Sequence, residues 1–589
     1  MTGTGTRDRS SVASGETRGL EIIRRAVQTI RRHMAGAAAF SALIALLYLA
    51  PSIYMMQIYD RVLTTGGLMT LVFMSLLLLV ALATHSFLEG ARQRLLTRAA
   101  VQIDQELSPT LLRTGFRNAG SPDPKRNQIM REFDLVRQAM QGPGATGLLD
   151  LPFVPVFIIV SFLLHPSIGL VVLLGAGVLV MIAVAGERAT KKAQSEAASR
   201  TPSIYAALEM SQAQGGTIRA LGMQSALSER LIDERYALND ITTRNAFVAG
   251  RYSGLTRLLR MILQSGVLGL GAYLAIIQEI SPGALIAGSI LAGRALAPIE
   301  QVVGSWRQLS QGRTAFEAVR SFLNAAPSDM KPMPLPAPIG RIDAEHVSLR
   351  AGGSDRWAIY NVSFQVLPGE SLGILGSSGA GKSTLARGLV GAQPFDGGTV
   401  RIDGGSLTDW DTEALGRYIG YLPQDLGLLP GTVGENISRF SRDGNAPELT
   451  VKAAREAGVH DLIQKLPHSY DTRIGFNGAG LSAGQAQRIA LARSLYNEPS
   501  VLVLDEPNSH LDSDGDVVLA AAVRNAKARG AAVIVITHRS GIIAEVDKLL
   551  ILKDGRVDQL GLRDEVLARL RNAAVQARRI RAVSGSTPP

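Results

Sequence analysis

The chain has 589 residues, too many for one ordinary domain, and 46% of them are hydrophobic although only 5% are aromatic. It contains no cysteine, which excludes a disulfide framework and any cysteine-based metal site. The formal net charge of +11 is compatible with a nucleic-acid partner, a membrane surface or a biased membrane topology, and the distribution of the charge must decide among them.

The first segment, residues 1–20, is polar and rich in Ser, Thr and Gly. It lacks the short apolar core and cleavage site of a signal peptide. We expect a disordered cytoplasmic tail there.

Six apolar windows follow, and each has the roughly 20 residues that a helix needs to cross a bilayer. They predict an α-helical transmembrane domain over residues 21–325. Buried core helices of a soluble protein are the alternative, and six such windows make that alternative improbable. The windows are 34–58, 68–88, 145–164, 168–186, 258–277 and 282–303.

Lys and Arg indicate the orientation of these windows. Seven arginines precede the first window and many basic residues lie in the two long connections, whereas Arg61 is the one basic residue of the three short connections. Excess positive charge near the ends of spans stays in the cytoplasm. The pattern predicts a multi-pass membrane protein whose termini and long connections are cytoplasmic, so the basic charge reflects topology and requires no nucleic acid.

Some polar residues lie where packing alone does not need them. Arg294 lies near the middle of the sixth window, and Asp150 lies at the cytoplasmic end of the third. Such a residue usually faces a wet interior, so both are candidates for a transport path. Arg294 could equally form a structural pair with a carboxylate on a neighbouring helix. Tyr59, Asp60 and Arg61 would form a polar cap on the periplasmic rim. They could pair across subunits to close the exit or contact a periplasmic adaptor. A plain interfacial anchor is the alternative.

From about residue 340 the sequence changes to short strands and glycine-rich turns, typical of a soluble α/β domain that we place at 340–565. "SLGILG" predicts a strand that leads into "GSSGAGKST" and a helix, the arrangement of a phosphate-binding loop. Lys382 would reach the β- and γ-phosphates and Ser383 would bind Mg²⁺. The expected nucleotide contacts are Gly376, Ser377, Gly379, Ala380, Gly381, Lys382, Ser383 and Thr384.

A second buried strand, "VLVL", ends at Asp505 and Glu506. Asp505 is placed to hold Mg²⁺, and Glu506 to polarise the attacking water, since phosphoryl transfer needs positioning, a metal and charge stabilisation. Without the phosphate loop, two solvated carboxylates would explain this pair equally well.

Gln424, "LSAGQ" at 481–485 and His538 are weak signals singly, but their order with the two phosphate motifs resembles the nucleotide-binding domain of ABC transporters over residues 340–560. The resemblance implies an ATPase in which Gln424 senses Mg²⁺-bound ATP, His538 holds the γ-phosphate and Glu506 is the base. It also implies that Ser482, Gly484 and Gln485 contact ATP bound to the opposite subunit, and that Asp512 lies at the subunit interface.

Two positions depart from the family pattern. Ala483 replaces a glycine of the usual LSGGQ, and one methyl group there should leave function intact. The aromatic residue that usually stacks on adenine is replaced by Ala351, so Trp357 either substitutes for it or packs on the sheet edge.

Only one phosphate loop and one LSAGQ occur, so the resemblance implies a homodimer that sandwiches two ATP molecules. It further implies coupling helices near 115–125 and 211–222, where turn residues interrupt the helical pattern. The last segment, 566–589, reads as a basic helix followed by a loose tail.

The stretches "MMQIYDRVL", "DLPFVPVFI" and "LAGRALAPIEQVVGSWRQLSQGR" resemble the inner-membrane ATPases of type I protein secretion. That branch implies a periplasmic adaptor protein, an outer-membrane channel and an unfolded protein substrate with a C-terminal signal. Export of a lipid or small amphiphile by the same fold remains the alternative. A DNA-clamping ATPase is nearly excluded by the six spans. The absence of cysteine excludes leader processing by a cysteine peptidase.

Overall fold

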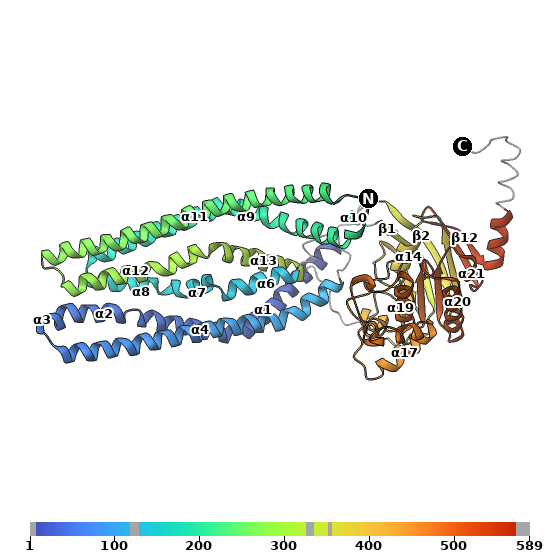
Figure 1. Cartoon of the computed structure of the whole chain (residues 1–589), viewed down its shortest axis with the longest axis horizontal. Helices are drawn as coiled ribbons and strands as arrows, with labels where there is room; N and C mark the ends of the chain where they lie inside the picture. The colour runs from blue at the N-terminus through green and yellow to red at the C-terminus, as the bar shows by residue number, and fades with distance from the viewer. Residues whose placement is uncertain (1–6, 118–128, 325–334, 352–355, 573–589) are drawn as a thin grey trace. The chain divides into compact units, whose positions relative to one another are not determined.

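A computed structural model describes residues 7–117, 129–324, 335–351 and 356–572. The chain forms two compact units, Met1–Ser328 and Asp329–Pro589 (Figure 1). The division falls between the membrane and nucleotide domains expected from the sequence. Each unit is described by itself.

The first unit is entirely helical in its described part. Six of its helical segments are long and apolar enough to cross a membrane, and each of them contains one of the six windows expected from the sequence. The helices are α1 (Arg7–Leu47), α2 (Ala50–Gln57), the π-helix η1 (Ile58–Val62), α3 (Leu63–Thr65), α4 (Leu68–Arg117), α6 (Ile129–Gln141), α7 (Pro143–Asp150), the 3₁₀ helix η2 (Leu151–Phe153), α8 (Val154–Leu164), α9 (Pro166–Ala213), α10 (Gly215–Ala220), α11 (Gln224–Ile276), α12 (Pro282–Gly304) and α13 (Trp306–Asn324).

Two long helix pairs frame this unit: α1 packs along α4, and α9 packs along α11 (Figure 1). Between them α12 contacts α2, α7, α8, α9 and α11, and it is the most buried span. Small residues at the α12 interfaces, including Ala284, Ala287, Ala292 and Ala295, let neighbouring backbones approach closely, as membrane helices require.

The long polar connections are continuations of the spans, as expected, because α4, α9 and α11 run for 50, 48 and 53 residues. Helix α1 already begins at Arg7, whereas we expected a disordered tail over residues 1–20; residues 1–6 lie outside the described part. Extending an existing helix needs no new nucleus, which explains how a polar segment can join it. A short α10 follows the break at Gln214, within the predicted 211–222 turn region. Most of the other such region, 115–125, lies outside the described residues.

Two spans are interrupted for identifiable reasons. The third changes to a 3₁₀ turn over Leu151–Phe153, where Pro152 and Pro155 cannot donate backbone hydrogen bonds. The first ends in the π-helix Ile58–Val62, which contains Asp60. The Asp60 carboxylate accepts hydrogen bonds from Ser281 Oγ at 2.5 Å and from the Gly283 backbone at 2.8 Å. Asp60 therefore caps the start of α12.

The second unit is built on a six-stranded sheet in the order β12-β11-β3-β10-β9-β6, beside a four-stranded antiparallel sheet, β2-β1-β4-β5, and a two-stranded pair, β7-β8. Its strands are β1 (Ile342–Arg350), β2 (Trp357–Val366), β3 (Ser371–Gly376), β4 (Gly397–Ile402), β5 (Gly405–Ser406), β6 (Ile419–Leu422), β7 (Gly431–Thr432), β8 (Arg473–Ile474), β9 (Val501–Asp505), β10 (Ala532–Ile536), β11 (Lys548–Lys553) and β12 (Arg556–Leu562).

Helices cover this sheet. They are α14 (Lys382–Leu389), α15 (Thr412–Gly416), α16 (Val433–Ile437), α17 (Ala446–Glu456), α18 (His460–Gln464), α19 (Ala483–Leu495), α20 (Ser513–Ala528) and α21 (Ser540–Ile543), with 3₁₀ turns at η3 (Ser469–Asp471) and η4 (Phe476–Gly478). The side chains of β9 alternate between two hydrophobic clusters. Leu502 and Leu504 pack with residues of the covering helices, whereas Val501 and Val503 pack with residues of the four-stranded sheet. Both faces of β9 are thus buried, as an apolar run in a parallel sheet predicts.

A last helix occupies residues 563–572. Its Val566 is fully buried against Val546 and Leu549. The boundary that we placed at 566 therefore falls inside an element of the nucleotide unit, and residues 573–589 lie outside the described part.

Candidate functional site

The parallel strands deliver the predicted nucleotide-binding groups to one edge of the sheet. Strands β3, β10, β9 and β6 are neighbours and run parallel. Their carboxyl ends lead to the phosphate loop, His538, Asp505 with Glu506, and Gln424. Ligands of open α/β sheets bind at this edge. Residues separated by more than 160 positions therefore meet here.

The phosphate loop has the conformation expected from its glycines. Gly381, the N-cap of α14, has φ = +93°, and a Cβ there would lie 2.3 Å from the Ala358 carbonyl oxygen. Lys382 Nζ donates to the carbonyls of Gly376 at 2.7 Å and Ser377 at 2.9 Å, within the loop. Burial lowers the pKa of the Lys382 ammonium, while the carboxylates of Glu506 and Asp505 oppose that shift. A phosphate group would give this partly desolvated cation a stronger partner.

Asp505 has the environment of a cation ligand. It is 2% exposed, it accepts a hydrogen bond from Ser383, and burial raises the pKa of its carboxyl group. Its Oδ1 atom has no hydrogen-bond partner among the described residues. The described residues also contain no cluster of three or more His, Asp or Glu side chains that could hold a metal ion without help from a bound nucleotide. Mg²⁺ suits such a site, because it often binds one carboxylate, a hydroxyl and nucleotide phosphates.

Glu506 is held in a strained conformation beside Gln424. Its φ is +49°, which is uncommon for a residue with a side chain, and its backbone N–H donates to Ile536 at 2.9 Å. Gln424 Nε2 donates to Glu506 Oε2 at 3.4 Å. The strain turns the chain at the end of β9 so that both carboxylates reach the nucleotide edge.

The LSAGQ segment begins α19 as a capping box. Ser482 Oγ accepts from the Gln485 backbone at 3.3 Å, and Gln485 Oε1 accepts from the Ser482 backbone at 2.9 Å. Ala483 is exposed, so its methyl group disturbs no packing. In the described part of the chain no hydrogen bond joins this cap to the phosphate loop.

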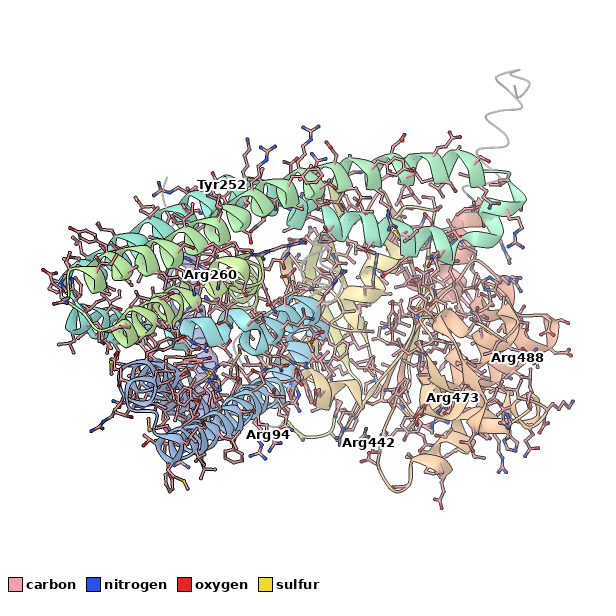
Figure 2. The ribbon with its side chains drawn as sticks, turned by 60° about the vertical axis from the view of Figure 1, so that its left-hand side comes forward. Arg94, Tyr252, Arg260, Arg442, Arg473 and Arg488 are labelled. Atoms are coloured by element: carbon pink, nitrogen blue, oxygen red, sulfur yellow. The ribbon has the colours of Figure 1, made fainter. Side chains whose placement is uncertain are left out.

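Asp512 lies in the loop that precedes α20. Arg488 of α19 (Figure 2) binds its carboxylate at 2.6 Å, and the Gly515 backbone donates to it at 2.9 Å. Both hydrogen bonds lower the pKa of the Asp512 carboxyl group, and the one from the Gly515 backbone has the larger effect. The contact joins the start of α20 to the helix that carries LSAGQ.

Sequence reasoning missed two buried arginines behind the Gln424 segment. Arg493, on α19, donates to the carbonyls of Gly427, at 2.8 Å, and Leu426. Arg439, with φ = +55°, donates to five carbonyls, including those of Arg493 and Ile419. Burial lowers the pKa of Arg439 to about 10. An arginine inside the apolar "IALARSL" was the available signal for Arg493.

Trp357 is the first residue of β2 and is 39% exposed. Its ring lies 5.6 Å from that of Tyr360, and the Arg350 guanidinium lies 5.1 Å above it. The adjacent Ala358 carbonyl touches the phosphate loop at Gly381. Trp357 therefore packs at the sheet edge and is also near the nucleotide side of the domain.

In the membrane unit, Asp150 and Arg294 line one hollow of about 50 Å³ between α1, α7, α8 and α12. Asp150 is paired with Arg92 of α4 at 2.6 Å, and Arg92 also donates to Ser41 at 2.9 Å. The Arg294 guanidinium lies 4.1 Å above the Tyr48 ring. Asp150, the carboxylate that lines the same hollow, is thus engaged by Arg92, and among the described residues Arg294 forms no ion pair.

Glu300, also on α12, pairs with Arg260 of α11 at 3.0 Å (Figure 2). Tyr59 lies in the π-helix, 39% exposed, next to the capping residue Asp60. The prediction that Tyr59, Asp60 and Arg61 form a polar cap on the periplasmic rim stays a prediction, while Asp60 caps the start of α12.

Comparison with known proteins agrees with this geometry. Residues 34–296 match the ABC transporter transmembrane region, and residues 359–509 match the ABC transporter ATP-binding family. The type I secretion system ATP-binding protein PrsD of Rhizobium meliloti is 38% identical over 92% of this chain and 94% of its own length. The chain is an ABC transporter of the type I secretion branch.

Other relatives of this transporter include the cyclolysin secretion/processing protein CyaB of Bordetella pertussis, 29% identical over 91% of this chain and 76% of its own. The leukotoxin translocation protein LktB of Mannheimia haemolytica is 28% identical over 87% of this chain and 73% of its own. A bacterial Atm1-family ABC exporter solved with ATP bound shares the fold, with a TM-score of 0.82 at 21% identity over 95% of this chain and 99% of that one. The expected fold class and ATPase activity are confirmed.

Proposed function

We propose that this transporter uses ATP hydrolysis to export an unfolded polypeptide through the bacterial inner membrane, as the ATPase of a type I secretion system. The observation that carries the proposal is the similarity to PrsD along nearly the whole chain, membrane unit included. ATPase domains alone are shared by many transporters, so the membrane unit is what distinguishes the cargo.

The proposed cycle assigns roles to the residues at the sheet edge. Lys382 and the loop backbone would hold the phosphates, Ser383, Asp505 and Gln424 would hold Mg²⁺, and Glu506 would polarise the attacking water as general base. His538 contacts the γ-phosphate. Trp357 supports adenine.

Ser482, Gly484 and Gln485 would act on ATP bound to a second copy of the chain, which makes a homodimer the working unit. The single phosphate loop and single LSAGQ of the sequence support this. A periplasmic adaptor, an outer-membrane channel and a cargo with a C-terminal signal complete the system. Both termini and the two long connections lie in the cytoplasm, and Arg294 contacts cargo in transit.

The decisive experiment compares culture-supernatant proteins from cells that carry the wild type, Glu506→Gln, or Glu413→Gln as a matched exposed control. We expect one or a few proteins to disappear from the medium and remain inside the cells only with Glu506→Gln. Equal supernatants, despite abolished ATP turnover, would overturn protein secretion and direct the search to lipids or small amphiphiles.

A further inference from the structure

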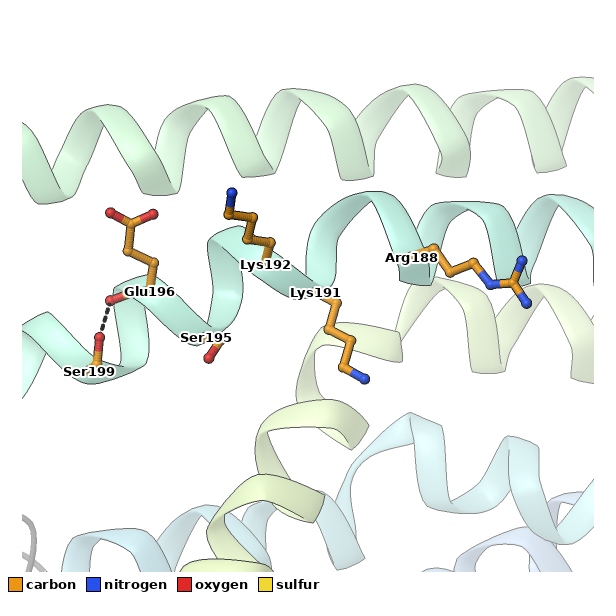
Figure 3. Close-up of a pocket in the computed structure, with 6 residues that line it drawn as sticks. All are labelled: Arg188, Lys191, Lys192, Ser195, Glu196 and Ser199. Carbon is orange, nitrogen blue, oxygen red and sulfur yellow. Dashed lines mark hydrogen bonds between the residues drawn. The ribbon is translucent and has the colours of Figure 1, made fainter.

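A row of three neighbouring cations on α9 has no carboxylate partner among the described residues and borders a common hollow. Arg188, Lys191, Lys192, Ser195, Glu196 and Ser199 line a hollow of about 590 Å³ (Figure 3). Within the described part of the chain, Arg188, Lys191 and Lys192 form no ion pair. The single carboxylate of the hollow, Glu196, is bound by Arg200 at 2.8 Å.

Some other cations of the unit are neutralised by ion pairs. Arg92, Arg137, Arg244, Arg260 and Arg313 all contact a carboxylate. Residues 1–328 hold 32 of the 61 basic and 21 of the 50 acidic side chains, so this unit carries the entire net charge of +11. The α9 row therefore adds positive charge that no ion pair in the described part of the chain neutralises, although Glu187 precedes it on the same helix.

The depth of the row matches the head-group layer of a bilayer. The apolar part of α9 runs from Pro166 to Gly186, and about 20 residues at 1.5 Å each span the roughly 30 Å hydrocarbon core. Arg188 then lies about 3 Å beyond the hydrocarbon and Lys191 and Lys192 about 8 Å beyond it. Figure 3 shows Arg188 and Lys191 extending away from α11, while Lys192 leans toward it. The helix face against α11 is closed by the buried Thr190 and by Gly186, which contacts Tyr252.

We propose that Arg188 and Lys191 form a binding site for the phosphate of an acidic phospholipid in the cytoplasmic leaflet, and that Lys192 adds positive charge beside it. Anionic lipids are attracted to basic residues at this surface by about 1 kcal/mol for each residue, or about fivefold in affinity. The Ser195 hydroxyl lies on the same face, one turn beyond the cations, and can bind head-group oxygens. This site rests on the proposed orientation, but not on the identity of the cargo.

The test measures lipid binding directly. Purified, delipidated full-length transporter is titrated with phosphatidylglycerol, or with neutral phosphatidylcholine, and bound lipids are counted by native mass spectrometry. Lys191→Gln/Lys192→Gln should weaken phosphatidylglycerol binding about 25-fold. Arg219→Gln/Arg235→Gln removes the same charge from α10 and α11, far from the membrane, and should bind like the wild type. Equal thermal unfolding of both variants verifies their folding.

Each arm has an outcome that overturns the proposal. Unchanged phosphatidylglycerol binding by Lys191→Gln/Lys192→Gln, or equal losses in both double variants, would refute a site. Complete displacement of the lipid by inorganic phosphate would show that a soluble anion is the ligand. Because the chain has no cysteine, Ser195→Cys provides a single thiol, and its labelling from the periplasm alone would overturn both this site and the proposed orientation. Loss of secretion is not a readout here, so failure of the cargo proposal remains distinguishable.

Discussion

At the scale of single residues, the nucleotide edge combines charge burial with backbone strain. Asp505 and Lys382 are both almost fully buried, and burial disfavours the charged form of each. Glu506 adds a positive φ. These groups therefore cost stability in the nucleotide-free protein, and bound Mg²⁺ and phosphate would compensate their charges.

Asp505→Asn should raise the melting temperature of the nucleotide-free protein while abolishing ATP hydrolysis. Since burial raises the folded-state pKa of Asp505, its stabilising contribution is complete below the ordinary carboxyl pKa near 4 and is lost as the pH rises through the raised value. At neutral pH the ionised group costs stability, which asparagine removes. We expect a rise of a few degrees by scanning calorimetry, since about 1 kcal/mol corresponds to roughly 2–4 °C in such a domain.

The control is the response to Mg²⁺ and ATP together, which should stabilise the wild type more than the asparagine variant. A lower melting temperature for Asp505→Asn at pH 7 without metal would contradict the assignment of Asp505 as a strained cation ligand.

Gly381→Ala should abolish ATP binding, because its Cβ would lie 2.3 Å from the Ala358 carbonyl oxygen and its φ is +93°. Gly391 provides the matched control: it has φ = +72°, but a Cβ there meets no atom within 4 Å. Gly391→Ala should cost only about 1 kcal/mol of stability through its left-handed backbone. Equilibrium binding of a fluorescent ATP analogue measures the difference, and equal affinities in the two variants would refute the close-approach argument.

At the scale of elements, helix α19 links two parts of the ATPase. Its first turn carries the LSAGQ cap, and its last turn carries Arg493, which holds the carbonyls of Leu426 and Gly427. The held segment directly follows Gln424, whose side chain is 3.4 Å from Glu506. A displacement of α19 would therefore be transmitted to the Gln424 segment.

Arg493→Lys should lower kcat for ATP hydrolysis about tenfold or more, with the KM for ATP within about twofold of the wild type. A lysine cannot donate to both carbonyls in a fork, and misplacement of a positioning group by about 1 Å costs up to 100-fold in rate. The phosphate loop, which dominates ATP binding, is untouched. Arg473→Lys, at an exposed position of β8 (Figure 2), is the control. Equal kinetics for both variants would show that Arg493 serves packing alone.

At the scale of the whole molecule, the chain provides one phosphate loop and one LSAGQ cap, and no hydrogen bond joins the two in the described part of the chain. Two copies would complete each ATP site, and the Ser377 and Ser482 side chains are both exposed. The membrane unit brings all of the net charge, while the ATPase unit is balanced.

The double variant Ser377→Cys/Ser482→Cys should form a covalent dimer with a short bis-maleimide, because the natural chain has no competing thiol. The yield on denaturing gels should rise several-fold with Mg²⁺ and ATP when Glu506→Gln is also present, since slow hydrolysis prolongs the closed state. Each single-cysteine variant should give far less product. A dimer band unaffected by nucleotide would count against a shared ATP site.

The sequence by itself determined the spans, the nucleotide motifs and the branch of the family. Each of these depends on local composition or on short, closely spaced patterns, such as the apolar windows and "GSSGAGKST". Even the strand–loop–helix context of Lys382 and the buried strand before Asp505 follow from local periodicity.

Only the tertiary structure decided the pairings between distant segments. Asp150 could have paired with Arg294, but α4 places Arg92 at 2.6 Å from it and leaves Arg294 over Tyr48. Asp60 caps α12 across more than 220 residues, and Arg493 reaches the Gln424 segment. An isolated Asp or Arg carries no local signal of its partner, because the partner is chosen by helix and strand packing and by the cost of leaving a buried charge or hydrogen-bonding group unsatisfied.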